Sequence, residues 1–144
     1  MTNREIAGIL DRIADMLQFQ EENAFKVNAY RKAARSIYHL DEDIRYVYRQ
    51  GRLQDIPGIG KAISEKIGEL IEKGSCQYFE RLQAEVPVGV VEMLAIPGVG
   101  HKTVKTLYDE LKITCMEELL EAAQNHKIRQ LPGMGDKIEA NIIK

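Results

Sequence analysis

Hydrophobic residues recur at helical spacing along almost the whole chain. The clearest stretch follows Thr2 and Glu5, which form a T-x-x-E capping box. Alternating apolar and polar positions, which indicate strands, are nearly absent. We therefore expect an all-α fold without a sheet. The apolar face of the first helix is formed by Ile6, Ile9, Leu10, Ile13, Met16 and Leu17.

Two further helices are expected before residue 52. Asp41 is placed to cap the later one, which ends near Gly51. Asn23 is placed to cap the earlier one, which extends to about His39. Within that earlier helix, the pattern places Tyr30, Ala33, Ala34 and Ile37 toward the core and Arg31, Lys32 and Arg35 toward solvent.

A five-residue unit, apolar-Pro-Gly-apolar-Gly, occurs three times, at residues 56–60, 96–100 and 131–135. We call these copies the first, second and third hairpins. Each ends one helical segment and opens another, so two small subdomains built around helix-hairpin-helix motifs are expected. The helices that follow the hairpins are expected over residues 61–73, where Gly74 is the left-handed cap, over 101–111, and from 136 onward.

Shorter helices fill the intervals between hairpins. They are expected over residues 75–83 and 114–123, and a second capping box of Thr114 and Glu117 starts the latter.

The segment 85–89, Glu-Val-Pro-Val-Gly, interrupts the helical periodicity. We place a domain boundary there, with residues 1–85 holding the first hairpin and 86–144 the other two. The chain stops at Lys144 after barely two turns of its last helix, so we expect the natural protein to continue.

Each hairpin places glycines at the start of a helix, where backbone N–H groups lack intrahelical partners and the helix dipole is positive. Glycine lets a phosphate approach the main chain, and the apolar residue between the glycines anchors the loop. Such a contact holds the DNA backbone and reads no base sequence. The residues expected to make it are Gly58, Gly60 and Lys61, then Gly98, Gly100, His101, Lys102 and Thr103, then Gly133 and Gly135.

The carbonyls of the same loops turn the opposite way. They are candidate ligands for a monovalent cation, Na⁺ or K⁺, between protein and phosphate. By position they belong to Gln54, Ile56 and Ile59, and to Leu94, Ile96 and Val99.

Composition narrows the kind of DNA contact. The chain has 144 residues, is 44% hydrophobic and has a net charge of −2, so it can fold but lacks the cations of a basic-arm binder. Cys76 and Cys115 show neither zinc-ligand nor disulfide spacing, and no leader or membrane-spanning stretch is visible. We expect a monomer in the cytoplasm that binds no membrane.

Lys66 lies at the edge of the apolar stripe on the helix after the first hairpin, about 85° from the stripe centre. Its stem is then partly buried and its amine partly desolvated, which favours a Schiff-base nucleophile. The structural alternative is a lysine that simply extends into water. The stripe consists of Ile63, Ile67, Leu70 and Ile71, and Glu65 lies outside it.

Three features together resemble the N-terminal lyase domain of family X DNA polymerases. They are F-K-V-N-A-Y-R-K-A-A at residues 25–34, the first Pro-Gly-Ile-Gly, and Glu-Lys-Ile at 65–67. The second hairpin is similar to the fingers subdomain of the same family. Bacterial members, which also carry a phosphoesterase-like domain, look most similar.

The resemblance implies a function in DNA base excision repair. The first hairpin would hold the 5′-phosphate side of a gap, and the second would hold the primer side. Lys66 occupies the Schiff-base position for attack on C1′ of a 5′-deoxyribose phosphate, with Glu65 or a water as the base. Lys26 and Tyr30 match residues of the 5′-phosphate pocket, and Arg31 is a further expected DNA contact.

Three positions depart from the family pattern. Ala62 replaces a phosphate-binding lysine, and Gln54 and Tyr78 stand at two other basic positions. Polymerisation needs three carboxylates and Mg²⁺ in a palm domain, which we expect beyond Lys144. The acidic run at residues 41–43 fits a solvated helix cap better than a metal site.

Two alternatives share these patterns. One is a non-enzymatic helix-hairpin-helix module that binds DNA, as in recombination, uptake or ligase-type proteins. The other is a protein-interaction module whose Pro-Gly turns only pack helices.

Overall fold

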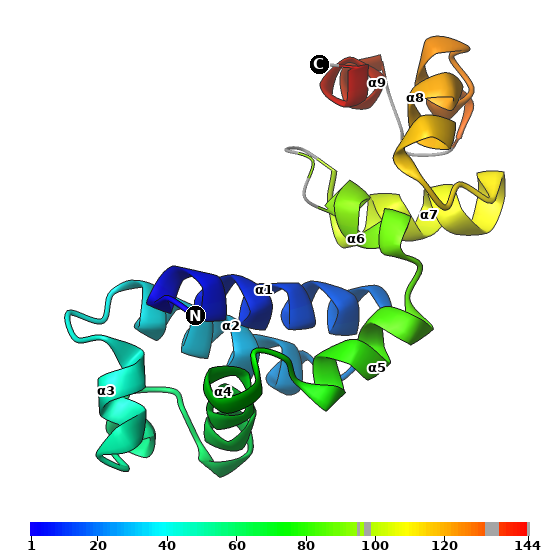
Figure 1. Ribbon diagram of the computed structural model, residues 1–144. Helices are drawn as coiled ribbons and strands as arrows, with labels where there is room; N and C mark the ends of the chain where they lie inside the picture. Colours follow the sequence, from blue (N-terminus) through cyan, green and yellow to red (C-terminus); the bar gives the residue numbers. More distant parts are fainter. Residues whose placement is uncertain (95, 97–98, 132–135, 144) are drawn as a thin grey trace. The chain divides into compact units, whose positions relative to one another are not determined.

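The computed structural model describes residues 1–94, 96, 99–131 and 136–143. The fold is all-α, and no strand occurs among these residues (Figure 1). The chain divides into two compact units, Met1–Ala84 and Glu85–Lys144. In the described residues no helix is long and apolar enough to span a bilayer.

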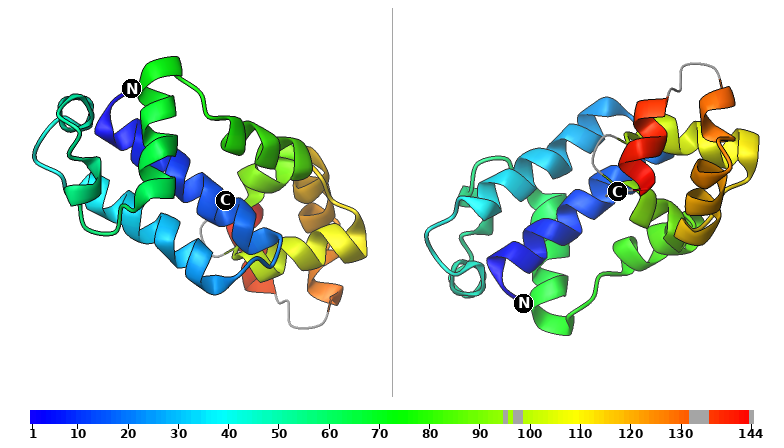
Figure 2. Two further views of the ribbon diagram at one scale, coloured as in Figure 1. Left: turned by 90° about the horizontal axis from the view of Figure 1, so that it is seen from below. Right: turned by 90° about the horizontal axis from the view of Figure 1, so that it is seen from above.

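The first unit is built on two antiparallel helices, α1 and α2, that lie side by side (Figure 1). The helix α4 runs across this pair rather than along it, as the change of view in Figure 2 shows. The elements of this unit are α1 (Asn3–Phe19), α2 (Ala24–Tyr38), α3 (Ile44–Arg49), the 3₁₀ turn η1 (Leu53–Asp55), α4 (Lys61–Lys73) and α5 (Gln77–Glu85).

Local sequence signals explain where α1, α2 and α4 begin and end. The capping box of Thr2 and Glu5 is confirmed, with both reciprocal hydrogen bonds at 3.1 Å. Asn23 Oδ1 accepts a hydrogen bond from the Phe25 amide at 2.7 Å, as expected of the α2 cap. Gly74 ends α4 in the left-handed conformation, with φ 74°.

The core of this unit contains most of the residues that the periodicity placed inward. Ile9 and Ile71 are the exceptions, because each lies at the edge of its stripe and stays partly exposed. The buried members include Ile6, Leu10, Ile13 and Leu17 of α1, Tyr30, Ala33, Ala34 and Ile37 of α2, and Ile63, Ile67 and Leu70 of α4.

The expected cap at Asp41 was wrong, because α3 is capped by Asp43, whose Oδ1 accepts a hydrogen bond from the Arg45 amide at 2.9 Å. A contact distant in sequence sets this start. The Asn3 side chain accepts a hydrogen bond from the Ile44 amide at 2.8 Å and donates one to the Glu42 carbonyl at 2.7 Å.

The second unit packs its helices around a close backbone contact at Gly89. The interruption predicted at residues 85–89 contains the start of a short helix, α6, whose Gly89 faces the chain before α8. A Cβ on Gly89 would lie 1.8 Å from the Thr114 carbonyl oxygen, so only glycine fits there. The elements are α6 (Val88–Leu94), α7 (His101–Leu111), α8 (Met116–Gln124), the 3₁₀ turn η2 (Ile128–Gln130) and α9 (Asp136–Ile143).

The second expected capping box was also wrong. The helix α8 begins two residues later than expected, after Cys115, which makes no side-chain cap. Glu118 rather than Glu117 therefore occupies the third helical position. Thr114 donates a hydrogen bond to the Glu118 carboxylate at 2.9 Å.

A buried carboxylate joins α9 to η2. Glu139 is 1% exposed and accepts hydrogen bonds from the Arg129 amide at 2.7 Å and the Arg129 Nε at 2.8 Å. His126 Nδ1 lies 3.1 Å from the same carboxylate. Burial acts to raise the pKa of Glu139, but the hydrogen bonds from Arg129 and His126 outweigh it and hold the pKa below its ordinary value.

Candidate nucleic-acid interface

The first hairpin is a tight turn closed by two main-chain hydrogen bonds. The Ile56 amide donates to the Leu53 carbonyl and the Ile59 amide donates to the Ile56 carbonyl, each at 3.1 Å. Gly58 adopts a positive φ of 86°, which a side chain would strain. Ile56 and Ile59 are buried, so the loop is anchored in the core as the pattern predicted. Gly60 then opens α4 from an extended conformation, with φ −92° and ψ −174°.

The second hairpin repeats this geometry in the residues that are described. The Ile96 amide donates to the Met93 carbonyl and the Val99 amide donates to the Ile96 carbonyl, again at 3.1 Å. Gly100 opens α7 with φ −86° and ψ 174°, nearly the values of Gly60. The repeat found in the sequence is therefore also a repeat of structure. Gly98 lies outside the described residues.

Both helix starts are left open to an external acceptor. Neither Gly60 nor Gly100 provides a side-chain cap for the amides of the first turn. A Cβ built on either glycine would have no atom of the described residues within 4 Å. Amides at a helix N-terminus with free space before them form a site for an anion.

The third hairpin is described only up to its entry. The Leu131 amide donates to the Ile128 carbonyl at 3.1 Å, which matches the entry to the other two hairpins. Gly133 and Gly135 lie outside the described residues.

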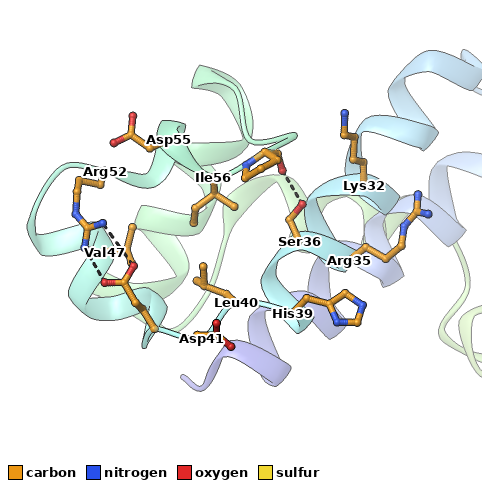
Figure 3. A pocket seen from close by; sticks show the side chains of 12 residues that line it. Lys32, Arg35, Ser36, His39, Leu40, Asp41, Val47, Arg52, Asp55 and Ile56 are labelled. Atoms are coloured by element: carbon orange, nitrogen blue, oxygen red, sulfur yellow. Dashed lines mark hydrogen bonds and ion pairs between the residues drawn. The ribbon is translucent and has the colours of Figure 1, made fainter.

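The helix α2 supports the first hairpin from one side. Ser36 Oγ donates a hydrogen bond to the Pro57 carbonyl at 2.6 Å (Figure 3). A groove of about 780 Å³ runs along this junction. Its lining includes the cations Lys32, Arg35 and Arg52, the carboxylates Asp41, Glu42 and Asp55, and the apolar Leu40, Val47 and Ile56.

Arg31 does not point into solvent as expected. Its guanidinium donates hydrogen bonds to Asp15 at 2.7 Å and to Gln18 at 3.0 Å, and it lies 3.7 Å from Asp11. Periodicity placed Arg31 on the polar face of α2 but had no information about α1. A DNA contact by Arg31 stays a prediction, and it competes with these bonds.

A second group of residues gathers around Tyr78, and we call it the Tyr78 cluster. The Lys66 ammonium lies 4.8 Å from the centre of the Tyr78 ring, the Lys26 ammonium 5.4 Å, and the Arg81 guanidinium 5.5 Å. The Tyr30 ring stacks on Tyr78 with centres 6.1 Å apart and planes 9° apart. Burial between the helices raises the pKa of the Tyr30 phenol above its ordinary value. Three cations around one aromatic ring form a positively charged surface.

A pocket of about 400 Å³ adjoins this cluster and is lined by Lys66, Tyr78, Arg81, Gln77 and two carboxylates, Glu65 and Glu69. The Lys66 amine is 3.4 Å from the Ala62 carbonyl and partly exposed, which keeps it accessible to a small electrophile. Glu69 is engaged within the pocket itself, since its carboxylate accepts a hydrogen bond from the Gln77 amide at 2.7 Å.

Comparisons with known proteins agree with this geometry. A family model described as "Helix-hairpin-helix domain" matches residues 1–76, and one described as "SAM-like Helix-hairpin-helix tandem" matches residues 90–144. The chain belongs to the helix-hairpin-helix family. It is also 37% identical, over all 144 residues, to the DNA polymerase/3'-5' exonuclease PolX of Bacillus subtilis (strain 168). The match confirms the resemblance to a bacterial family X polymerase, and the chain spans 25% of that relative's length.

Within this helix-hairpin-helix chain the structure groups the predicted site residues unevenly. Lys26 and Tyr30 of α2 and Lys66 of α4 meet at Tyr78 of α5. Glu65 is exposed beside them. Lys61 and Lys102 are exposed on the first turns after their hairpins, and His101 and Thr103 are partly exposed. Their contacts with DNA stay predictions.

Two residues of the first unit were missed. Tyr78 was seen in the sequence only as the loss of a basic residue, whereas it is the ring on which the cations gather. Arg81 was not considered, although its spacing of three from Tyr78 on a helix places the two side chains together.

The acidic residues at 41–43 make contacts that stabilise the fold. Asp43 caps α3, and Glu42 pairs with Arg52 at 3.0 Å. In the described part of the chain no three His, Cys, Asp or Glu side chains are grouped to hold a metal ion, and Cys76 and Cys115 are free thiols.

Proposed function

We propose that this chain is the DNA-binding region of a family X DNA polymerase and that it binds gapped or nicked DNA through backbone phosphates. The observation that carries the proposal is the matching pair of open helix starts at Gly60 and Gly100. Two such sites on one chain fit the two sides of a gap. The similarity to PolX supports the same assignment.

A titration of gapped duplex over a range of salt concentrations tests this proposal. The expected result is a negative slope of log affinity against log salt, with about 0.9 contributed by each phosphate neutralised by a cation. A random change of the duplex sequence should leave the affinity unchanged, because phosphate contacts carry no base information. Absence of binding at low salt would leave only the protein-interaction alternative.

The Tyr78 cluster supports a second, finer proposal: Lys66 acts as a 5′-deoxyribose-phosphate lyase nucleophile. The amine adds to the C1′ aldehyde and water leaves, which forms an imine. Glu65 or a water then removes a C2′ proton, the electrons form a C2′–C3′ double bond, and the C3′–O bond breaks to release the downstream strand with its 5′-phosphate. Water hydrolyses the imine and frees Lys66. Lys26 and Arg81 supply positive charge for the sugar's own phosphate.

Borohydride trapping on a 5′-deoxyribose-phosphate duplex distinguishes the lyase from a non-enzymatic DNA-binding module. Reduction of the imine gives a covalent adduct in the wild-type chain and none in Lys66→Ala. Lys73→Ala, which removes an exposed lysine of the same helix, is the matched control and should trap normally. DNA affinity is measured for the wild type and both variants. If the affinities are equal, the missing adduct in Lys66→Ala reflects the loss of the nucleophile and not a loss of DNA binding. Failure of the wild-type chain to trap would remove the lyase and leave the DNA-binding proposal intact.

The hairpin carbonyls remain the proposed site for Na⁺ or K⁺. In the first hairpin the Ile56 carbonyl already accepts the Ile59 amide, and its second lone pair is available to a cation together with Gln54 and Ile59. Mg²⁺ is proposed only for the polymerase part of the parent protein.

A further inference from the structure

The side of α2 that faces the first hairpin carries two cations that the resemblance does not assign. Lys32 and Arg35 lie within one turn of Ser36, whose hydroxyl holds the Pro57 carbonyl. Figure 3 shows both side chains at the same end of the groove, beside the hairpin. The contact between α2 and the loop therefore fixes where these charges lie.

Lys32 is held directly against the turn. A Cβ built on Gly58 would lie 2.8 Å from Lys32 Cγ, 3.1 Å from Cδ and 3.4 Å from Cε. The aliphatic stem thus crosses the face of Gly58, which is open only because glycine has no side chain. Apolar packing of a lysine stem with its ammonium left in water is favourable, and here it places the charge at the rim of the loop.

The charged groups near Lys32 leave its ammonium available to bind a phosphate. Among the described residues Lys32 forms no ion pair, whereas its neighbour Arg31 is bonded to Asp15. Of the carboxylates in the groove, Glu42 is paired with Arg52 at 3.0 Å. The other two, Asp41 and Asp55, both lie away from Lys32 in Figure 3. The end of the groove next to Gly58 is therefore the positive end.

We propose that Lys32, with Arg35 beside it, binds a second backbone phosphate adjacent to the one held by the amides of the first hairpin. The inference rests on the proposed DNA-binding function and extends its contact from the start of α4 onto α2. Gly58 then has two tasks: it forms the turn, and it provides the surface along which Lys32 reaches the strand.

Lys32→Met tests this site, because methionine retains most of the apolar stem and removes only the charge. Binding of the full 144-residue chain to a gapped duplex is measured over a range of salt concentrations. The slope of log affinity against log salt should become shallower by about 0.9, the contribution of one phosphate contact. Lys32→Arg should keep the wild-type slope, and Lys73→Met, which removes an exposed lysine at the far end of α4, should keep it as well.

Thermal unfolding is measured for each variant to check that the variant is still folded. A wild-type slope in Lys32→Met overturns this site while leaving the DNA-binding proposal standing. A shallower slope in Lys73→Met equal to that in Lys32→Met also overturns it, since the effect would then be one of total charge. If the wild-type chain shows no salt-dependent binding, the proposed function itself fails, and this site fails with it.

Discussion

Replacing Gly60 by serine (Gly60→Ser) separates a phosphate-binding hairpin from a simple turn. Gly60 has the extended backbone typical of an N-cap residue, and a Cβ there meets no atom within 4 Å in the part of the chain that the structure describes. Serine therefore fits without strain. Its hydroxyl can accept a hydrogen bond from an amide of the first turn of α4, which is the group that a phosphate oxygen would use.

The expected effects on stability and on binding have opposite signs. A serine cap in place of glycine adds a few tenths of a kcal/mol, and the reduced freedom of the unfolded chain adds a similar amount, so the free energy of unfolding should rise by about 0.5 kcal/mol. A hydrogen bond to a charged group contributes about 1.5–3 kcal/mol, so losing one to phosphate should weaken DNA binding by about tenfold or more.

Urea unfolding and a gapped-duplex titration measure the two effects on the same protein. Thr2→Ala is the control, because it removes a cap distant in sequence from both hairpins. It should lower the free energy of unfolding by about 1 kcal/mol and leave DNA affinity unchanged. A Gly60→Ser chain that binds gapped DNA as tightly as the wild type would refute the argument that these amides hold phosphate.

Two further predictions concern the second unit. Gly89→Ala should lower the free energy of unfolding of this unit by about 3 kcal/mol or more, because the new Cβ overlaps the Thr114 carbonyl. The control is Gly8→Ala in α1 of the first unit, where the new Cβ makes only an ordinary contact at 3.9 Å with the Tyr38 hydroxyl, so stability should rise by about 0.5–1 kcal/mol. Urea denaturation measures both, and a mild effect at Gly89 would contradict the close contact. Glu139→Gln should destabilise this unit at pH 7, because it removes the charge that Arg129 and His126 stabilise. The folded-state pKa of Glu139 lies below its ordinary value of 4.5, so the stabilisation by the ionised carboxylate is present above about pH 4.5 and is lost as pH falls through the folded pKa. Thermal unfolding from pH 3 to 7 should therefore show the wild type and Glu139→Gln converging toward acid, and a constant difference would exclude this role.

The helices that follow hairpins could be predicted from sequence because their signals are local. The helices α4 and α7 begin and end at the residues expected, since glycine fixes the start of both. Caps set by distant residues could not be predicted in the same way. Asp41 and Asp43 are equally good caps by composition, and the choice is made by Asn3, which lies about forty residues earlier and holds the chain at Ile44.

In the candidate site, too, features set by local sequence could be predicted and features set by distant residues could not. The glycines of the hairpins and the lysine at the stripe edge were visible as patterns within single helices. The different roles of Arg31 and Lys32 were not, because periodicity places both on the polar face of α2. Contacts with α1 engage Arg31, and contact with Gly58 places Lys32 at the hairpin. The gathering of cations at Tyr78 likewise depends on three helices that meet only in the folded chain.

These contacts explain how a chain of net charge −2 can present positive charge to DNA. Several carboxylates are engaged by neighbours within the fold, as Asp15 is by Arg31, Glu42 by Arg52 and Glu139 by Arg129. In the first unit, three cations gather at Tyr78 beside two carboxylates, Glu65 and Glu69, and Lys32 forms no ion pair among the described residues. Because attraction between exposed charges decays within about 10 Å at ordinary salt, a phosphate responds to these local groups rather than to the total charge. The resulting contact is short, so its affinity depends on the geometry of the hairpin amides as much as on the number of lysines.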